Sequence, residues 1–63
     1  MNIEKIFHGK SDAGSGSTID VIRNEENGLY AIIVNDETGY ADLIVLDKEM
    51  IRDMSQKILE EMK

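Results

Sequence analysis

The chain has 63 residues and a net charge of −6, with 13 acidic side chains against 7 lysines and arginines. It has no cysteine and one histidine, His8, which excludes disulfides, thiolate metal sites and an imidazole cluster within one chain. A domain of about 60 residues buries only about 60% of the surface that its unfolded chain exposes. We therefore expect one small domain, residues 1–63, supported by self-association as a dimer.

The sequence carries no segment that indicates a membrane or an export route. No stretch reaches the roughly 18 to 20 apolar residues that cross a bilayer. The first ten residues, MNIEKIFHGK, lack the apolar core and the cleavage site of a signal peptide. We therefore expect a cytoplasmic protein without membrane association.

The negative charge is concentrated in the middle of the chain. Residues 17–46 contain six acidic side chains and a single arginine, a net charge of −5. Proteins that bind nucleic acid draw most of their affinity from basic side chains that neutralise phosphates. This distribution argues against nucleic acid as a partner and is typical of a surface that keeps a small protein soluble.

The first two segments of the chain differ sharply in composition. Residues 2–8 hold three apolar side chains, and we expect a strand there. Residues 9–17, GKSDAGSGS, consist mostly of glycine, serine and short polar side chains, which favours a flexible loop. The lysine of this loop, Lys10, precedes Gly14 and Gly16, whereas the lysine of a phosphate-binding P-loop follows the glycines.

A β-hairpin is predicted next, because two runs rich in Ile and Val flank Asn27-Gly28. Asn-Gly is the preferred pair for a two-residue type I′ turn, in which both central residues need positive φ. Such a turn predicts three strand pairs among others: Arg23 with Ile32, Ile22 with Ile33, and Val21 with Val34.

A second hairpin is predicted around residues 36–39, Asp-Glu-Thr-Gly, followed by YADLIVL. A slip of one residue moves every side chain of a strand to the other face of the sheet, so the register can be chosen by the apolar pattern. A four-residue loop pairs Ile32 with Leu43, whereas a three-residue loop pairs Val34 with Asp42. We favour the four-residue loop, because it keeps Asp42 off the apolar face.

These registers sort the side chains into two faces. The predicted core face carries Ile19, Val21, Tyr30, Ile32, Val34, Ala41, Leu43 and Val45, with Arg23 at its margin. The centre of the second face carries Ile22, Leu29, Ala31, Ile33, Ile44 and Leu46.

From Asp47 the apolar spacing changes to three and four residues, which predicts an amphipathic helix. Asp47 can cap its start, and Glu49 suits the positive end of the helix dipole. The apolar stripe consists of Met50, Ile51, Met54, Ile58, Leu59 and Met62. The fold class is therefore α+β: an antiparallel β-meander of three to four strands, packed on one C-terminal amphipathic helix.

The second face of the sheet is a candidate interface, since it has an apolar centre and a polar rim. Two alternatives stay open: a solvated face that needs no partner, and cover by the N-terminal segment through Ile3, Ile6 or Phe7. The candidate interface residues are Ile22, Leu29, Ile33, Ile44 and Leu46. Glu25, Glu26, Asp36 and Glu37 form a candidate acidic surface for a partner protein.

No pattern of side chains predicts catalysis, a cofactor or a metal site. His8 has no acidic neighbour at a fixed spacing, and Ser11, Ser15 and Ser17 lie in the glycine-rich segment, which holds no nucleophile in place. The acidic residues near Asp36 lack the spacing of a calcium-binding loop. We therefore expect a protein that is not an enzyme.

The expected order of four strands and one helix is similar to that of the single-strand-binding transcriptional coactivators of the PC4 family. That resemblance implies a dimer formed through the helices and nucleic-acid binding on the sheet. This chain departs from it, because its meander has one arginine, no lysine and six acids. Size and acidity also resemble those of short accessory proteins of phages and mobile elements.

The sequence thus supports two functions from different classes. The first is a small acidic protein-interaction or regulatory module that binds another protein, as a homodimer. The alternative is a coactivator-like protein that binds single-stranded nucleic acid.

Overall fold

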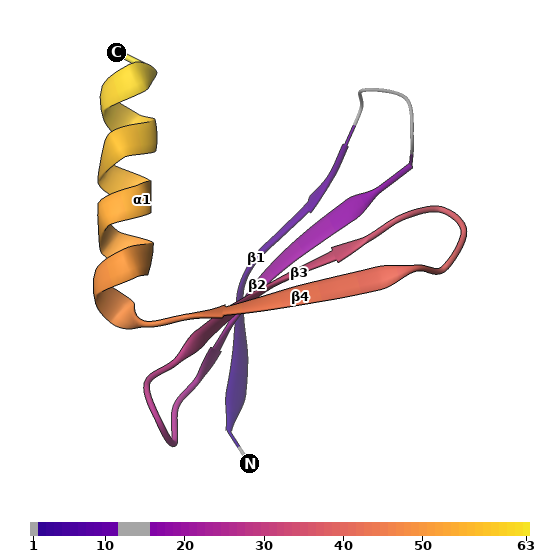
Figure 1. The fold of residues 1–63 in the computed structure, drawn as a ribbon, viewed down its shortest axis with the longest axis horizontal. Coiled ribbons are helices and arrows are strands. Elements are labelled where there is room, and N and C mark those ends of the chain that lie inside the picture. The colour runs from indigo at the N-terminus through magenta and orange to yellow at the C-terminus, as the bar shows by residue number, and fades with distance from the viewer. Residues whose placement is uncertain (1, 12–15) are drawn as a thin grey trace.

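A computed structural model of the chain describes residues 2–11 and 16–63. It contains a four-stranded antiparallel sheet followed by one helix, which confirms the predicted α+β arrangement (Figure 1). The strands lie side by side in chain order, so each is paired with its neighbours in the sequence. The elements are β1 (Ile3–Lys10), β2 (Thr18–Asn24), β3 (Tyr30–Asn35), β4 (Ala41–Leu46) and α1 (Lys48–Glu61).

Strand β1 is longer than the sequence predicts, because it includes Gly9 and Lys10, two residues of the expected loop. The ring of Phe7 covers Gly9: a Cβ atom on this glycine would lie 3.0 Å from ring carbons. A bulge between Lys5 and Phe7 interrupts the pairing of β1 with β2. Residues 12–15 of the predicted loop lie outside the described residues.

The β2–β3 turn is longer than the predicted type I′ turn, so that prediction is wrong. Asn24 and Leu29 close a four-residue loop, with the Asn24 N–H donating to the Leu29 carbonyl over 2.9 Å. Gly28 has φ of 72°, whereas Asn27 lacks the positive φ that a type I′ turn requires. The register is shifted by two residues and pairs Val21 with Ile32. An even shift leaves the faces of β2 and β3 as predicted.

The side chain of Asn24, rather than that of Asn27, begins this turn. Its Oδ1 accepts a hydrogen bond from the Glu26 N–H at 2.9 Å, the pattern of an Asx-turn. The Oδ1 of Asn27 accepts from the Leu29 N–H at 2.9 Å and supports the exit from the turn. Asparagine therefore stabilises both ends of the loop.

The β3–β4 turn has a three-residue loop, so the predicted four-residue loop is wrong. Asp36 donates its N–H to the Tyr40 carbonyl over 2.9 Å, and Gly39 has φ of 93°. A three-residue loop with its last residue in the left-handed region is a common hairpin connection. Val34 consequently pairs with Asp42, the pair that the predicted register avoids.

The side chain of Asp36 explains why this loop is preferred. Its Oδ1 accepts hydrogen bonds from the Thr38 hydroxyl at 2.7 Å and from the N–H groups of Thr38 and Tyr40, each at 2.9 Å. The bond from Thr38 contributes most to lowering the pKa of Asp36, with the backbone N–H groups adding to it. These local bonds outweigh the placement of one acid opposite Val34.

The one-residue shift moves every side chain of β4 to the opposite face from the prediction. Ala41, Leu43 and Val45 leave the predicted core face, while Ile44 and Leu46 join it. We name the two faces by their position relative to α1. The helix-side face carries Phe7, Ile19, Val21, Ile32, Val34 and Ile44, and the far face carries Ile3, Ile22, Ala31, Ile33, Leu43 and Val45.

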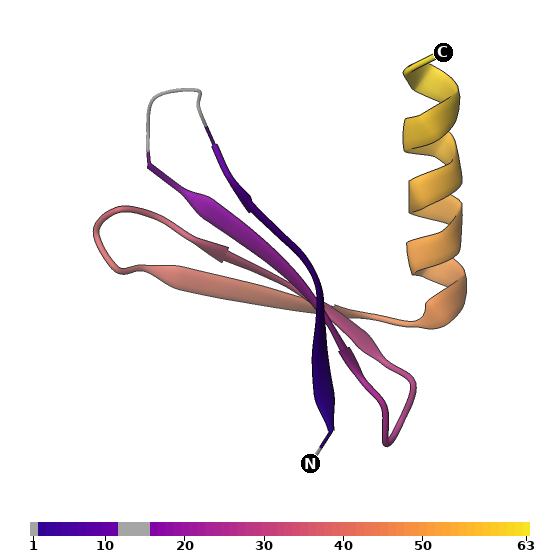
Figure 2. The same ribbon diagram turned by 180° about the vertical axis from the view of Figure 1, so that it is seen from behind.

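Helix α1 begins as predicted but does not lie across the sheet. The Oδ1 of Asp47 accepts a hydrogen bond from the Met50 N–H at 2.8 Å, and Glu49 lies in the first turn. The helix stands away from the sheet at the end of β4 (Figures 1 and 2). None of its residues is buried, and extensive contacts between elements are confined to neighbouring strands. The predicted packing of the helix on the sheet is therefore wrong for this structure.

A single residue, Asp47, connects β4 to α1. Asp47 is extended, with φ of −84° and ψ of 173°, and it also caps the helix. Among the described residues, Ala31 and Leu46 are the buried apolar side chains, each 9% exposed.

Candidate functional site: an apolar sheet face beside an unpartnered helix

The helix-side face is an apolar surface that the fold leaves open to solvent. Phe7, Val34 and Ile44 are each about half exposed, at 55%, 44% and 57%. Two shallow depressions of about 310 Å³ and 120 Å³ lie on this face and meet at Val34. The first is lined by the apolar side chains of Phe7, Ile19 and Val34, and at its end by Lys10, Ser11, Ser17 and Thr18.

Helix α1 adds a second apolar surface next to this face. Met50, Ile58 and Leu59 are at least half exposed on the helix. A free helix of 14 residues is marginally stable in water, because most helical stability in proteins comes from packing of the apolar side. The stripe that the sequence predicts therefore exists, and within the described part of the chain it has no partner.

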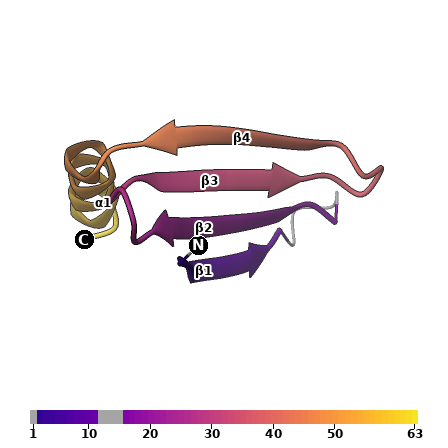
Figure 3. The ribbon, with the colours of Figure 1, turned by 90° about the horizontal axis from the view of Figure 1, so that it is seen from below.

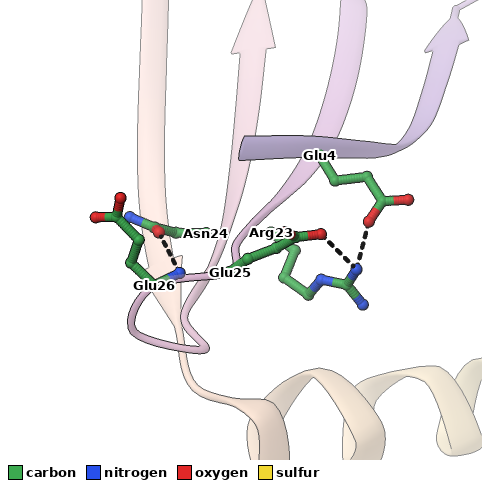
Figure 4. A network of polar contacts seen from close by, with 5 residues as sticks. All are labelled: Glu4, Arg23, Asn24, Glu25 and Glu26. Atoms are coloured by element: carbon green, nitrogen blue, oxygen red, sulfur yellow. Dashed lines mark hydrogen bonds and ion pairs between the residues drawn. The ribbon is translucent and has the colours of Figure 1, made fainter. Parts of the chain in front are cut away.

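A polar cluster borders the helix-side face near the β2–β3 turn. Arg23 forms ion pairs with Glu4 and, at 3.3 Å, with Glu25 (Figure 4). Figure 4 also shows that Glu4 and Arg23 lie on the side of the sheet toward which α1 runs. A hydrogen bond with Tyr30, and next the charge of Glu4, raise the pKa of Arg23. The single arginine of the meander thus contacts two acidic side chains.

A second polar cluster lies on the far face, along β1. The Nδ1 of His8 lies 2.5 Å from the Oδ1 of Asp20, and the Nζ of Lys5 lies 3.4 Å from the same oxygen. The hydrogen bond with His8 is the main reason that the pKa of Asp20 is lowered. His8 therefore has an acidic neighbour across the strands, which its position in the sequence does not indicate. The side chains of Lys5 and His8 are exposed, at 58% and 54%, whereas that of Asp20 is only 17% exposed.

The predicted interface residues are not brought together by the structure. Ile22 and Ile33 lie on the far face, Ile44 and Leu46 lie on the other face, and Leu29 lies at the end of the β2–β3 turn. Leu46 is also buried. The one-residue difference in the register of β4 causes this division.

The predicted acidic surface is also divided, since its residues lie in two turns at opposite ends of the sheet (Figure 1). Glu25 and Glu26 lie in the β2–β3 turn, and Asp36 and Glu37 belong to the β3–β4 turn. Two of the four have structural roles, because Glu25 pairs with Arg23 and Asp36 orders its own turn. Each end of the sheet is nevertheless acidic.

The described residues show no arrangement that points to a metal site or a membrane span. No three potential ligands among His, Asp and Glu gather within residues 2–11 and 16–63. No helix in the described part of the chain has the length and the apolar character that a membrane crossing needs.

Comparisons with protein-family models, with curated proteins and with solved structures give no match for this chain. The similarity in element order to the single-strand-binding coactivators therefore stays a hypothesis.

Proposed function

We propose that this chain is a protein-interaction module that acts as a homodimer and binds another protein. The observation that carries this proposal is the mismatch between a thin core and a wide apolar surface. Two apolar side chains are buried among the described residues, whereas the helix-side face and the stripe of α1 are both open to solvent. Contiguous apolar surface of this kind marks sites of protein association.

The total accessible surface supports the same proposal. A folded monomer of 7.1 kDa is expected to expose about 4,100 Å². The chain exposes 5075 Å², roughly 1,000 Å² more than that expectation. A specific protein interface buries about 800 Å² on each partner, so the excess matches the share of one partner in such an interface.

The charge of the chain indicates the kind of partner. The net charge is −6, and acidic turns flank the apolar face at both ends. A surface of this sign raises the rate of association with a basic partner and repels nucleic acid. We therefore expect the partner to be a protein with basic groups around an apolar contact.

The proposal is tested by capture from source lysate with the tagged chain, with and without nuclease. The matched variant replaces Glu26 and Glu37 with glutamine. It leaves Asp36, which orders its turn, and Glu25, which pairs with Arg23, unchanged. We expect one stoichiometric protein that survives nuclease, and weaker, less salt-dependent capture by the variant. Equal capture by both baits would remove the electrostatic part of the proposal. Capture that nuclease abolishes, with saturable binding to an unstructured oligonucleotide, would favour the nucleic-acid alternative.

A further inference from the structure

We propose that β4 is the docking edge for a second copy of this chain. The β4 strands of two copies pair antiparallel across a two-fold axis and join two four-stranded sheets into one. This inference rests on the homodimer proposed above and identifies the contact between its two copies, the paired β4 strands, which we call the seam. The two edge strands of the sheet, β1 and β4, differ in the features that permit or prevent such pairing.

Strand β1 has the features with which natural proteins block an exposed edge. A bulge between Lys5 and Phe7 breaks its regular pairing and bends the strand. Lys5 and Lys10 add positive charge along the same edge. Bulges and lysines on edge strands prevent pairing with another chain. A second copy therefore finds no suitable template at β1.

Strand β4 has almost none of these features. Its pairing with β3 runs without irregularity from Ala41 to Leu46. Its sequence, ADLIVL, has no lysine, proline or glycine, and Asp42 is its one charged residue. Six residues span about 20 Å, and five of them are exposed. A regular apolar edge of this kind is a template for strand pairing.

The backbone groups that face away from β3 can be identified. Hydrogen bonds alternate along an antiparallel pair, so the bond between Asp36 and Tyr40 places Asp42 and Ile44 at positions bonded to β3. Leu43 and Val45 then direct their N–H and C=O groups outward. The Oδ1 of Asp42 accepts the Leu43 N–H at 2.8 Å, as expected for a group that β3 does not use.

A two-fold axis at Ile44 satisfies these outward groups. Leu43 of each copy then forms a hydrogen-bonded pair with Val45 of the other. The N–H of Leu43 replaces its hydrogen bond to the Asp42 carboxylate with one to the Val45 carbonyl of the second copy. The two Ile44 residues meet at a non-hydrogen-bonded site, where opposite side chains approach most closely. Identical antiparallel strands are complementary to themselves, which is the property that an isologous contact requires.

The helix leaves this edge uncovered. Figure 3 shows α1 at one end of the sheet, with β4 as the outermost strand along its whole length. A two-fold axis perpendicular to the sheet places both helix-side faces on the same side of the joined sheet. The dimer would thus present one continuous apolar surface with a helix at each end, for the partner protein of the proposed function.

Cysteine cross-linking tests the seam directly, because the natural chain has no cysteine. In Ile44→Cys the two thiols lie across the axis, at a Cα separation of about 4.5 Å that suits a disulfide. The matched control is Tyr40→Cys, which is exposed but lies more than about 20 Å from its equivalent in this register. We expect mild oxidation to convert most of Ile44→Cys to a covalent dimer and little of Tyr40→Cys. Equal cross-linking of both, or of neither, would overturn the seam.

A pair of proline variants provides the second test. Leu43→Pro removes an outward N–H, a position where an edge strand tolerates proline, so we expect a folded monomer. Ile44→Pro removes a bond to β3 and is expected to lose folded structure. Circular dichroism reports the fold and light scattering the mass. A Leu43→Pro chain that stays dimeric would contradict the seam.

The two proposals fail in distinguishable ways. A natural chain that is monomeric in solution would overturn the homodimer and the seam together. If the natural chain is dimeric but Ile44→Cys does not cross-link and Leu43→Pro stays dimeric, the β4 seam is overturned and the homodimer stands.

Discussion

The two edges of the sheet differ in the features that permit or prevent strand pairing with another chain. Strand β1 carries a bulge and two lysines, whereas β4 is regular and almost entirely apolar. A sheet with two open edges would add copies without limit and form fibres, because nothing closes the assembly. If each copy has only one edge available for pairing, the assembly is complete after two copies. The asymmetry therefore favours a finite dimer over an open-ended assembly.

The largest effect is expected from opening the β1 edge. Deleting Ile6 removes the bulge and keeps the pairing on both sides of it, since Lys5 pairs with Ile22 and Phe7 with Val21. Combined with Lys5→Thr and Lys10→Thr, the deletion gives the sheet two open edges. We expect assemblies much larger than a dimer, detected by light scattering and electron microscopy. The two threonine substitutions with the bulge retained are the control and should stay dimeric.

A lysine on β4 should have the next largest effect, because it transfers one of the features of β1 to the open edge. Val45→Lys places a charge opposite apolar Leu43 of the second copy in the proposed seam. We expect the dimer to weaken at least about tenfold, a change of about 1.4 kcal/mol. Sedimentation equilibrium measures the dissociation constant of the dimer. The control, Ile33→Lys, puts the same charge on the far face of β3, and equal weakening by both variants would argue against the edge.

The glycines of the two turns provide a smaller effect that separates folding from association. Gly28→Ala and Gly39→Ala each force a side chain into positive φ, at 72° and 93°. Each should lower the free energy of unfolding by about 1 kcal/mol, a fall in Tm of about 4–8 °C. Only Gly39→Ala, next to β4, should also weaken the dimer. Thermal melts and sedimentation on both variants make the comparison.

The smallest effect is expected from pH, through Asp36. Its pKa is lowered in the folded chain from an ordinary value of 3.8, so its carboxylate stabilises the β3–β4 turn above that pH. The contribution is lost as the pH falls through the lower folded value. We expect the Tm of Asp36→Asn to fall less than that of the natural chain between about pH 5 and pH 2.5, roughly the range in which such a carboxyl titrates. Identical pH profiles would show that Asp36 does not order the turn.

The order of elements was predictable because each element has its own local pattern. Runs of Ile and Val bounded by glycine and asparagine predict the strands, and the three-and-four spacing after Asp47 predicts the helix. The Asp47 cap was predictable as well, since Asp at this position accepts a backbone N–H of the first turn.

The registers were not predicted, because they depend on side chains that compete for the same turn. Asn-Gly at 27–28 favours a two-residue loop, but Asn24 begins the turn instead. In the second hairpin, Asp36, Thr38 and Gly39 together contain the signal for a three-residue loop. That local signal outweighs the apolar pattern from which the register was predicted.

The residues of the candidate site depend on the strand registers, so the site was only partly predicted. The apolar parts of β2 and β3 were sorted correctly, whereas β4 was inverted. Amphipathic spacing identifies the apolar side of a helix but not the surface that it contacts, so the position of α1 was also missed. The open β4 edge could have been found from the sequence, by comparing ADLIVL with the lysines of the first strand.

The most direct test of the proposed dimer is the molar mass of the natural chain in solution, measured by light scattering over a range of concentrations. One open edge predicts a single species of twice 7.1 kDa that dissociates on dilution. A constant mass of 7.1 kDa would contradict the dimer, and a mass that keeps rising with concentration would contradict the closed edge at β1.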